Sequence, residues 1–167
     1  MHDELTEKDL EKMRAELNER KNVLMPELIE EVKRTRAFGD LSENYEYKAA
    51  KQAHNRNRSR IRYLENMIAS AKVIKDESGE GEVGLYDRVT VYIEEDDETN
   101  EVQVVTTVRC DPLNGLISKE SPLGSLLLGK HVGDRFTVRV SESYSYTAVV
   151  RAIVKGEDDG SAELLGY

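Results

Sequence analysis

GDLSENYEYKAAK (residues 39–51) separates two segments whose apolar residues recur at helical spacing. The segment before it carries these at Leu10, Met13, Leu17, Leu24, Leu28 and Val32. The segment after it carries them at Ala50, Ala53, Ile61, Leu64, Ile68 and Ala71. Such spacing is typical of amphipathic helices that pack along a common seam. Gly39 can end the first helix and Asp40 can cap the second. Because the connection is short, the two helices are predicted to run antiparallel as a hairpin.

Each arm of this hairpin has about thirty residues, which corresponds to a length of roughly 45 Å. Thr6 and Asp9 form the pattern of a capping box at the start of the first arm. Pro26 lies inside that arm, where a proline removes a hydrogen bond and crowds the preceding turn. We therefore expect a bend or a short break near Pro26.

After residue 82 the apolar period changes from that of a helix to two, as in β-strands. The alternating positions are Val89, Val91 and Ile93, then Phe136, Val138 and Val140, and then Tyr146, Ala148, Val150, Ala152 and Val154. Turn signals separate these runs, and 121–130 is predicted to form a short helix with Ser121 as its cap and Pro122 as its first residue. The predicted class is α+β, with a coiled-coil hairpin followed by a small antiparallel β domain.

The composition divides the chain in the same way. Residues 1–75 form the predicted hairpin, 76–82 a linker, 83–155 the β domain and 156–167 a loose acidic tail. Of the net charge of −9, residues 1–75 contribute +2 and residues 76–167 contribute −11. An acidic surface repels phosphate, so any contact with nucleic acid is expected from the hairpin.

Several classes of protein and site are not supported by the residues. Cys110 is the only cysteine, which excludes an intrachain disulfide and favours a reducing, cytoplasmic location. No apolar run is long enough to span a membrane. The three histidines are scattered, and neither a zinc set nor a nucleophile motif is present.

The acids of the quoted stretch, Asp40 and Glu43, permit two interpretations. As a cap and its partner three residues later, they would satisfy free amides at a helix start. As two carboxylates at the end of a long hairpin, they form half of a Mg²⁺ site, because Mg²⁺ often takes one or two carboxylates and completes its shell elsewhere. Glu46 adds a third acid nearby, and Asn44 can support the turn.

Behind these acids, the second arm carries a stripe of basic residues. Lys48, Lys51, Arg58 and Arg62 fall within about 80° of one another on a helix, whereas Arg56 and Arg60 are predicted to point elsewhere. Arg36 enters the turn from the first arm. The stripe is either a solvated surface or a track for a nucleic-acid strand.

These residues resemble a known family. GDLSENYEYKAAK is similar to the tip sequence of the bacterial GreA/GreB transcript cleavage factors, with GreA the nearer branch. GLISKESPLGSLLLGK followed by VGD resembles the signature of their C-terminal domain. The resemblance covers roughly residues 5–155. It departs at Tyr45, where the family often has a small residue, and at the terminal segment, which runs past the usual end.

The resemblance implies an FKBP-like fold for the β domain and a function as a transcription elongation factor. In that family the C-terminal domain docks at the rim of the RNA polymerase secondary channel, and the hairpin enters the channel. Carried over by position, Asp40 and Glu43 hold a Mg²⁺ ion jointly with the polymerase, and the free protein is not expected to bind it. The polymerase, not the factor, then cuts the 3′ end of the backtracked RNA.

The resemblance also implies roles for other residues. Arg36 and Lys51 match basic positions that face the displaced RNA, with Lys48, Arg58 and Arg62 extending the stripe. Glu120, Ser121 and Pro122 match the segment that meets the polymerase rim. The factor is expected to act as a monomer. Two alternatives stay open: an inhibitor of the same fold that occupies the same channel, and an FKBP-like chaperone, which the absence of an aromatic-lined pocket disfavours.

Overall fold

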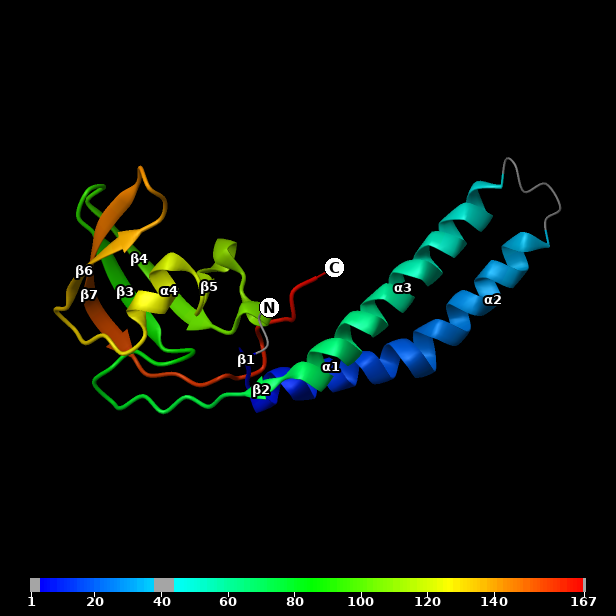
Figure 1. Ribbon diagram of the computed structural model, residues 1–167, viewed down its shortest axis with the longest axis horizontal. Helices are drawn as coiled ribbons and strands as arrows, with labels where there is room; N and C mark the ends of the chain where they lie inside the picture. Colours follow the sequence, from blue (N-terminus) through cyan, green and yellow to red (C-terminus); the bar gives the residue numbers. More distant parts are fainter. Residues whose placement is uncertain (1–3, 38–43, 167) are drawn as a thin grey trace. The chain divides into compact units, whose positions relative to one another are not determined.

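The computed structural model describes residues 4–37 and 44–166, which form two compact units (Figure 1). Residues 10–72 make up a helical unit, and residues 4–9 with 73–166 make up a sheet unit. The α+β class predicted from the sequence is confirmed, with the helical hairpin preceding the sheet in the chain.

In the helical unit, two arms lie side by side and pack through a narrow apolar seam (Figure 1). The first arm consists of α1 (Glu7–Glu19), a π-helical turn η1 (Arg20–Leu24) and α2 (Met25–Arg36), and the second is α3 (Tyr45–Ser70). The buried apolar side chains of the seam are Leu10, Met13, Ala50, Ile61, Leu64 and Met67.

Pro26 does not interrupt the first arm. The turn before it is widened, and the Met25 amide donates to the Arg20 carbonyl, one residue further back than in an α-helix. Pro26 then occupies the first turn of α2, where a missing N–H is tolerated. The predicted bend near Pro26 is confirmed: it takes the form of a π-turn just before the proline, and the arm changes direction there between α1 and α2 (Figure 1).

Polar side chains take two of the inward positions of α3. Asn57 and Arg60 are buried, whereas Ala53, predicted to lie in the seam, is exposed. Arg60 is 4% exposed and reaches Glu16 of the first arm, with 3.0 Å between its Nη2 and the Glu16 Oε2. The apolar pattern missed this part of the seam because ion pairs and hydrogen bonds replace apolar contacts there.

The sheet unit is built on a five-stranded sheet in the order β5-β4-β3-β7-β6. The strands are β3 (Arg88–Ile93), β4 (Glu98–Val105), β5 (Leu116–Ser118), β6 (Arg135–Arg139) and β7 (Ser145–Val154). Three ladders are antiparallel, but β4 and β5 pair in parallel. The sheet is therefore mixed, because the connection through η2 (Thr107–Arg109) and η3 (Pro112–Asn114) returns the chain in the direction of β4.

The predicted alternation holds along β3 and along the first half of β7. Val89, Val91 and Ile93 are buried, as expected. In β7, however, Ala152 and Val154 are exposed. Thr90 pairs with Ala152 while Val91 pairs with Val150, so Arg151 is an extra residue, as in a β-bulge. Beyond it, the side chains of β7 that would have faced the core lie on the opposite side of the sheet.

The helix predicted after residue 120 is present as α4 (Pro122–Leu127). Ser121 is its cap, accepting a hydrogen bond from the Gly124 amide at 3.0 Å, and Pro122 is its first residue. Gly124 lies so close to β5 that a Cβ there would be 2.1 Å from the Ser118 carbonyl oxygen. The small residue is required for α4 to pack on the sheet.

The two ends of the described chain belong to the sheet unit. A two-stranded sheet joins β1 (Glu4–Leu5) to β2 (Lys72–Val73), and the predicted capping box of Thr6 and Asp9 is confirmed. The C-terminal segment is not the loose tail that the sequence suggested. Its Ala162 joins the buried core, because acidic and apolar residues of this segment find partners far away in the sequence.

Candidate functional site

The candidate site lies at the connection between the arms of the hairpin. Asp40 and Glu43, the two acids predicted to hold Mg²⁺, fall outside the described residues, as does Gly39. On either side of them, α2 ends at Arg36 and α3 begins at Tyr45. The sequence placed the cap of the second helix at Asp40, but the cap of α3 is Asn44.

Asn44 connects the two helices that flank the acidic stretch. Its Oδ1 accepts a hydrogen bond from the Tyr47 amide at 2.8 Å, and its Nδ2 donates to the Thr35 carbonyl oxygen at 2.6 Å. Thr35 is fully buried, and its hydroxyl donates to carbonyls of the preceding turn. One amide side chain therefore caps α3 and ties it to the last turn of α2.

A chain of charges also links these helices. Arg34 pairs with Glu31 of its own helix at 2.6 Å and lies 3.8 Å from Glu46 of α3. Hydrogen bonding to Arg34 lowers the pKa of the exposed Glu31. Glu46 is thus placed on the hairpin beside Asn44, whereas Arg36 is exposed to solvent.

The basic stripe predicted on α3 is present on its solvent-facing side. Lys48, Lys51, Arg58 and Arg62 are all exposed. Within 4–37 and 44–166, no carboxylate lies within ion-pairing distance of Lys51, Arg58 or Arg62. Their positive charge is therefore not neutralised by those parts of the protein.

Part of this stripe borders a shallow groove of ≈ 380 Å³ along α3. The groove is lined by Lys48, Lys51, Gln52, Asn55, Arg56 and Ser59. Arg56, which the sequence analysis left out of the stripe, is exposed and borders this groove with Lys48, whereas Arg58 and Arg62 do not line it. On a helix Arg56 lies about 80° from Lys48, on the side opposite to Arg58, so a groove beside Lys48 can include it although the stripe does not.

Arg60 does point away from the stripe, as predicted, and its role is structural. It donates to Glu16, while Arg20 donates to Asn57 at 3.0 Å and Asn57 donates back to the Arg20 carbonyl. The sequence signal for this cluster was available: two polar residues stand at helical spacing between Ala50 and Leu64. Together they fix the register of the two arms behind the basic groove.

In the sheet unit, the candidate docking residues surround the start of α4. Glu120 and Pro122 are exposed, and Glu120 accepts a hydrogen bond from the Thr107 hydroxyl at 3.0 Å. The Ser121 hydroxyl donates to the Ser118 carbonyl at 2.6 Å and caps the helix. The side chain of Ser121 therefore stabilises the backbone of this surface, whereas Glu120 and Pro122 are exposed on it.

The described residues contain no group of three or more histidine, cysteine, aspartate or glutamate side chains arranged to hold a metal ion. None of the described helices is both long and apolar enough to cross a membrane.

Comparison with known proteins covers most of the chain. Residues 4–73 match the family described as transcription elongation factor, N-terminal, and residues 77–154 match the family described as transcription elongation factor, GreA/GreB, C-term. The transcription elongation factor GreA of Mesomycoplasma hyopneumoniae is 40% identical over 141 residues, or 84% of this chain and 88% of that protein. GreA of Bacillus subtilis is 37% identical over 147 residues, or 88% of this chain and 94% of that protein.

Among solved structures, GreA factor homolog 1 (Gfh1) of Thermus thermophilus is 27% identical, with a TM-score of 0.43 over 93% of this chain and all of that one.

Proposed function

Because the chain belongs to the GreA/GreB family of transcription elongation factors, we propose that it stimulates cleavage of backtracked 3′ RNA by RNA polymerase and so rescues arrested complexes. Factors of this family activate cleavage by the polymerase and do not catalyse it themselves. The observation that carries the proposal is the match of both halves of the chain, 4–73 and 77–154, to this family.

The proposed route divides the work between the two units. The helical unit enters the secondary channel, and the sheet unit docks at its rim through Glu120 and Pro122. The exposure of these two side chains supports this assignment. The capping role of Ser121 supports a contribution to the shape of the docking surface rather than to its chemistry.

At the tip, Asp40 and Glu43 are proposed to hold Mg²⁺ together with the polymerase. Their chemistry fits the ion, because Mg²⁺ prefers oxygen ligands and commonly takes only one or two carboxylates from a protein. When bound, the ion supplies positive charge to the oxygens of the phosphodiester under attack. Two carboxylates provide only part of an octahedral shell, so we propose that the free protein does not retain the ion.

The 3′ segment of the RNA is proposed to lie along α3. Lys48, Lys51 and Arg56 border the groove, and the exposed Arg58 and Arg62 continue the positive surface. Arg36 contributes from the end of α2. This contact is electrostatic and should weaken steeply as salt is raised.

The test is a cleavage assay on a stalled, backtracked elongation complex with labelled RNA. Wild-type protein is expected to shorten the RNA in the presence of Mg²⁺. Asp40→Ala or Glu43→Ala should abolish shortening while binding to polymerase, measured separately, is kept. Glu30→Ala, an exposed acid on the same hairpin, is the matched control and should behave as wild type.

Shortening by the Asp40→Ala, Glu43→Ala double variant would refute the metal-holding role. Inhibition of nucleotide addition by wild-type protein without any shortening would instead identify an inhibitor. Replacing Lys51 and Arg58 together should raise the protein concentration needed for half-maximal cleavage, and the difference from wild type should shrink at high salt.

A further inference from the structure

The C-terminal segment 156–166 lies beyond the second family match, which ends at residue 154, yet it is bound tightly to the sheet unit. Arg109 of η2 is its main partner. This side chain is fully buried, its Nε donates to the Ala162 carbonyl at 2.6 Å, and its two terminal nitrogens each lie 2.7 Å from a carboxylate oxygen of Asp158. Such paired geometry is the strong form of an arginine–carboxylate contact.

The same guanidinium reaches a second acid from the opposite end of the chain. Arg109 Nη1 is 3.0 Å from Asp9 Oδ1, and Asp9 is fully buried. The other oxygen of Asp9 accepts hydrogen bonds from the Thr106 hydroxyl and the Thr6 amide, both at 2.8 Å. Asp9 belongs to the first turn of α1, so Arg109 joins that turn to the C-terminal segment.

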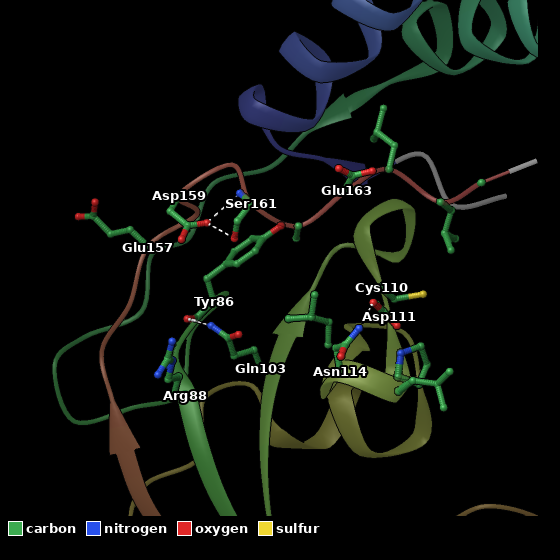
Figure 2. Close-up of a pocket in the computed structure, with 17 residues that line it drawn as sticks. Tyr86, Arg88, Gln103, Cys110, Asp111, Asn114, Glu157, Asp159, Ser161 and Glu163 are labelled. Carbon is green, nitrogen blue, oxygen red and sulfur yellow. Dashed lines mark hydrogen bonds between the residues drawn. The ribbon is translucent and has the colours of Figure 1, made fainter.

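Further contacts keep the segment in place. The Leu165 amide donates to the Val108 carbonyl at 2.7 Å, and Ala162 belongs to the same buried core as Tyr86. Figure 2 shows the Tyr86 ring pointing toward the part of the segment that carries Ser161. Among the described residues, the hydrogen bonds to Asp159 come from the amide and hydroxyl of Ser161, within the segment. Asp158 is therefore bonded to a residue outside the segment, whereas the hydrogen bonds of its neighbour Asp159 stay inside it.

We propose that residues 156–166 form a strap that holds the first turn of α1 on the sheet unit, with Asp158 acting through Arg109 as a positioning residue. Without Asp158, the Arg109 guanidinium keeps Asp9 as its one carboxylate partner. Water can then reach a guanidinium that is fully buried in the wild-type protein. Asp9 would then be held by a mobile partner instead of a fixed one. The first turn of α1 should loosen, although Asp158 stands far from it in the sequence.

The test is hydrogen exchange on the full chain, read from peptides that cover residues 4–12. In Asp158→Ala, the protection of these amides should fall by about tenfold or more, as expected for the loss of a charged hydrogen-bonded pair. Asp159→Ala is the matched control and should leave them unchanged. Deletion of residues 156–167 should reproduce the effect of Asp158→Ala, and Asp158→Glu should restore part of the protection.

Unchanged protection of residues 4–12 in Asp158→Ala, with exchange increased only in 156–166, would overturn the proposal, because Asp158 would then hold nothing but its own segment. Global unfolding of Asp158→Ala would also be distinguishable, since exchange would rise throughout 73–154. In that case Asp158→Asn, which keeps an acceptor oxygen, decides: selective loosening of residues 4–12 supports the strap, and its absence refutes it.

A functional consequence rests on the proposed function. If the first turn of α1 must be held for the hairpin to deliver its tip, Asp158→Ala should lower the maximal cleavage rate severalfold while the affinity for polymerase stays the same. Equal rates in the two proteins would refute this consequence. Absence of cleavage by wild-type protein would refute the proposed function, whereas the exchange experiment tests the strap independently.

Discussion

Arg60 allows a quantitative test of what holds the arms of the hairpin together. Its side chain is 5% exposed, and Glu16, its partner across the seam, is 26% exposed. Replacing Glu16 by alanine leaves the guanidinium buried without its carboxylate, which costs about 3–5 kcal/mol when a pair is completely buried. Because water reaches Glu16, we expect a smaller loss of about 1.5–3 kcal/mol in the free energy of unfolding.

The reverse substitution should cost less. Arg60→Met removes the buried charge together with its need for a partner, and it retains most of the side-chain volume. A buried ion pair contributes little over a well-packed apolar side chain, so the expected loss is below about 1 kcal/mol. Glu16 would still have Arg20, whose Nη2 lies 3.2 Å away.

The measurement is urea unfolding followed by far-ultraviolet circular dichroism, which reports mainly on the helical unit. Glu30→Ala is the control, because Glu30 pairs with Lys33 at 3.6 Å on an open surface, and it should be indistinguishable from wild type. The reasoning would be refuted if Glu16→Ala behaved like Glu30→Ala. It would also fail if Arg60→Met were the more destabilising of the two seam variants.

Three further predictions follow from single side chains. Asn44→Ala removes both the cap of α3 and the hydrogen bond to the Thr35 carbonyl. It should lower the free energy of unfolding by about 1–2 kcal/mol in the same urea experiment. An unchanged urea midpoint would contradict this role of Asn44. Tyr86→Phe should leave the melting temperature unchanged or raise it, because the Tyr86 hydroxyl is buried and, among the described residues, has no hydrogen-bond partner; a clear decrease would show that the hydroxyl is satisfied. Burial of Asp158 opposes its ionisation, but hydrogen bonds from Arg109 outweigh this and hold its pKa below the ordinary value of 3.8. The resulting stability is present above pH 3.8 and is lost as the pH falls through the lowered pKa, so acid unfolding of Asp158→Asn should be less steep than that of wild type in this range.

The hairpin was predictable because its determinants are local. Apolar residues at Leu10, Met13, Ile61 and Leu64 repeat with the period of a helix, and all four are buried in the seam. The spacing between Ala50 and Leu64 put Asn57 on the inward face, but its hydrogen-bond partner, Arg20 of the other arm, appears only in the structure. The alternation along β3 was also local, and it held.

Prediction failed where distant segments decide the outcome. Ala152 is exposed instead of buried because β7 contains an extra residue, which only its pairing with β3 reveals. Asp40 and Glu43 were identified from the sequence alone, and their role as metal ligands stays a prediction.

The sequence by itself determined the helical and strand periodicities of the apolar residues and the caps at Thr6 and Ser121. It also determined the asymmetry of charge and the family to which the chain belongs. These properties depend on residues close together in the chain, where helix and strand periods and capping hydrogen bonds operate. Only the tertiary structure decided the fate of the C-terminal segment. From its sequence alone, an acidic stretch resembles a solvated tail, because a buried guanidinium that would bind it cannot be recognised. Arg109 lies 49 residues from Asp158 and 100 from Asp9, so no local pattern connects them. Charges so far apart in sequence are brought into one buried cluster by the folding of the sheet unit.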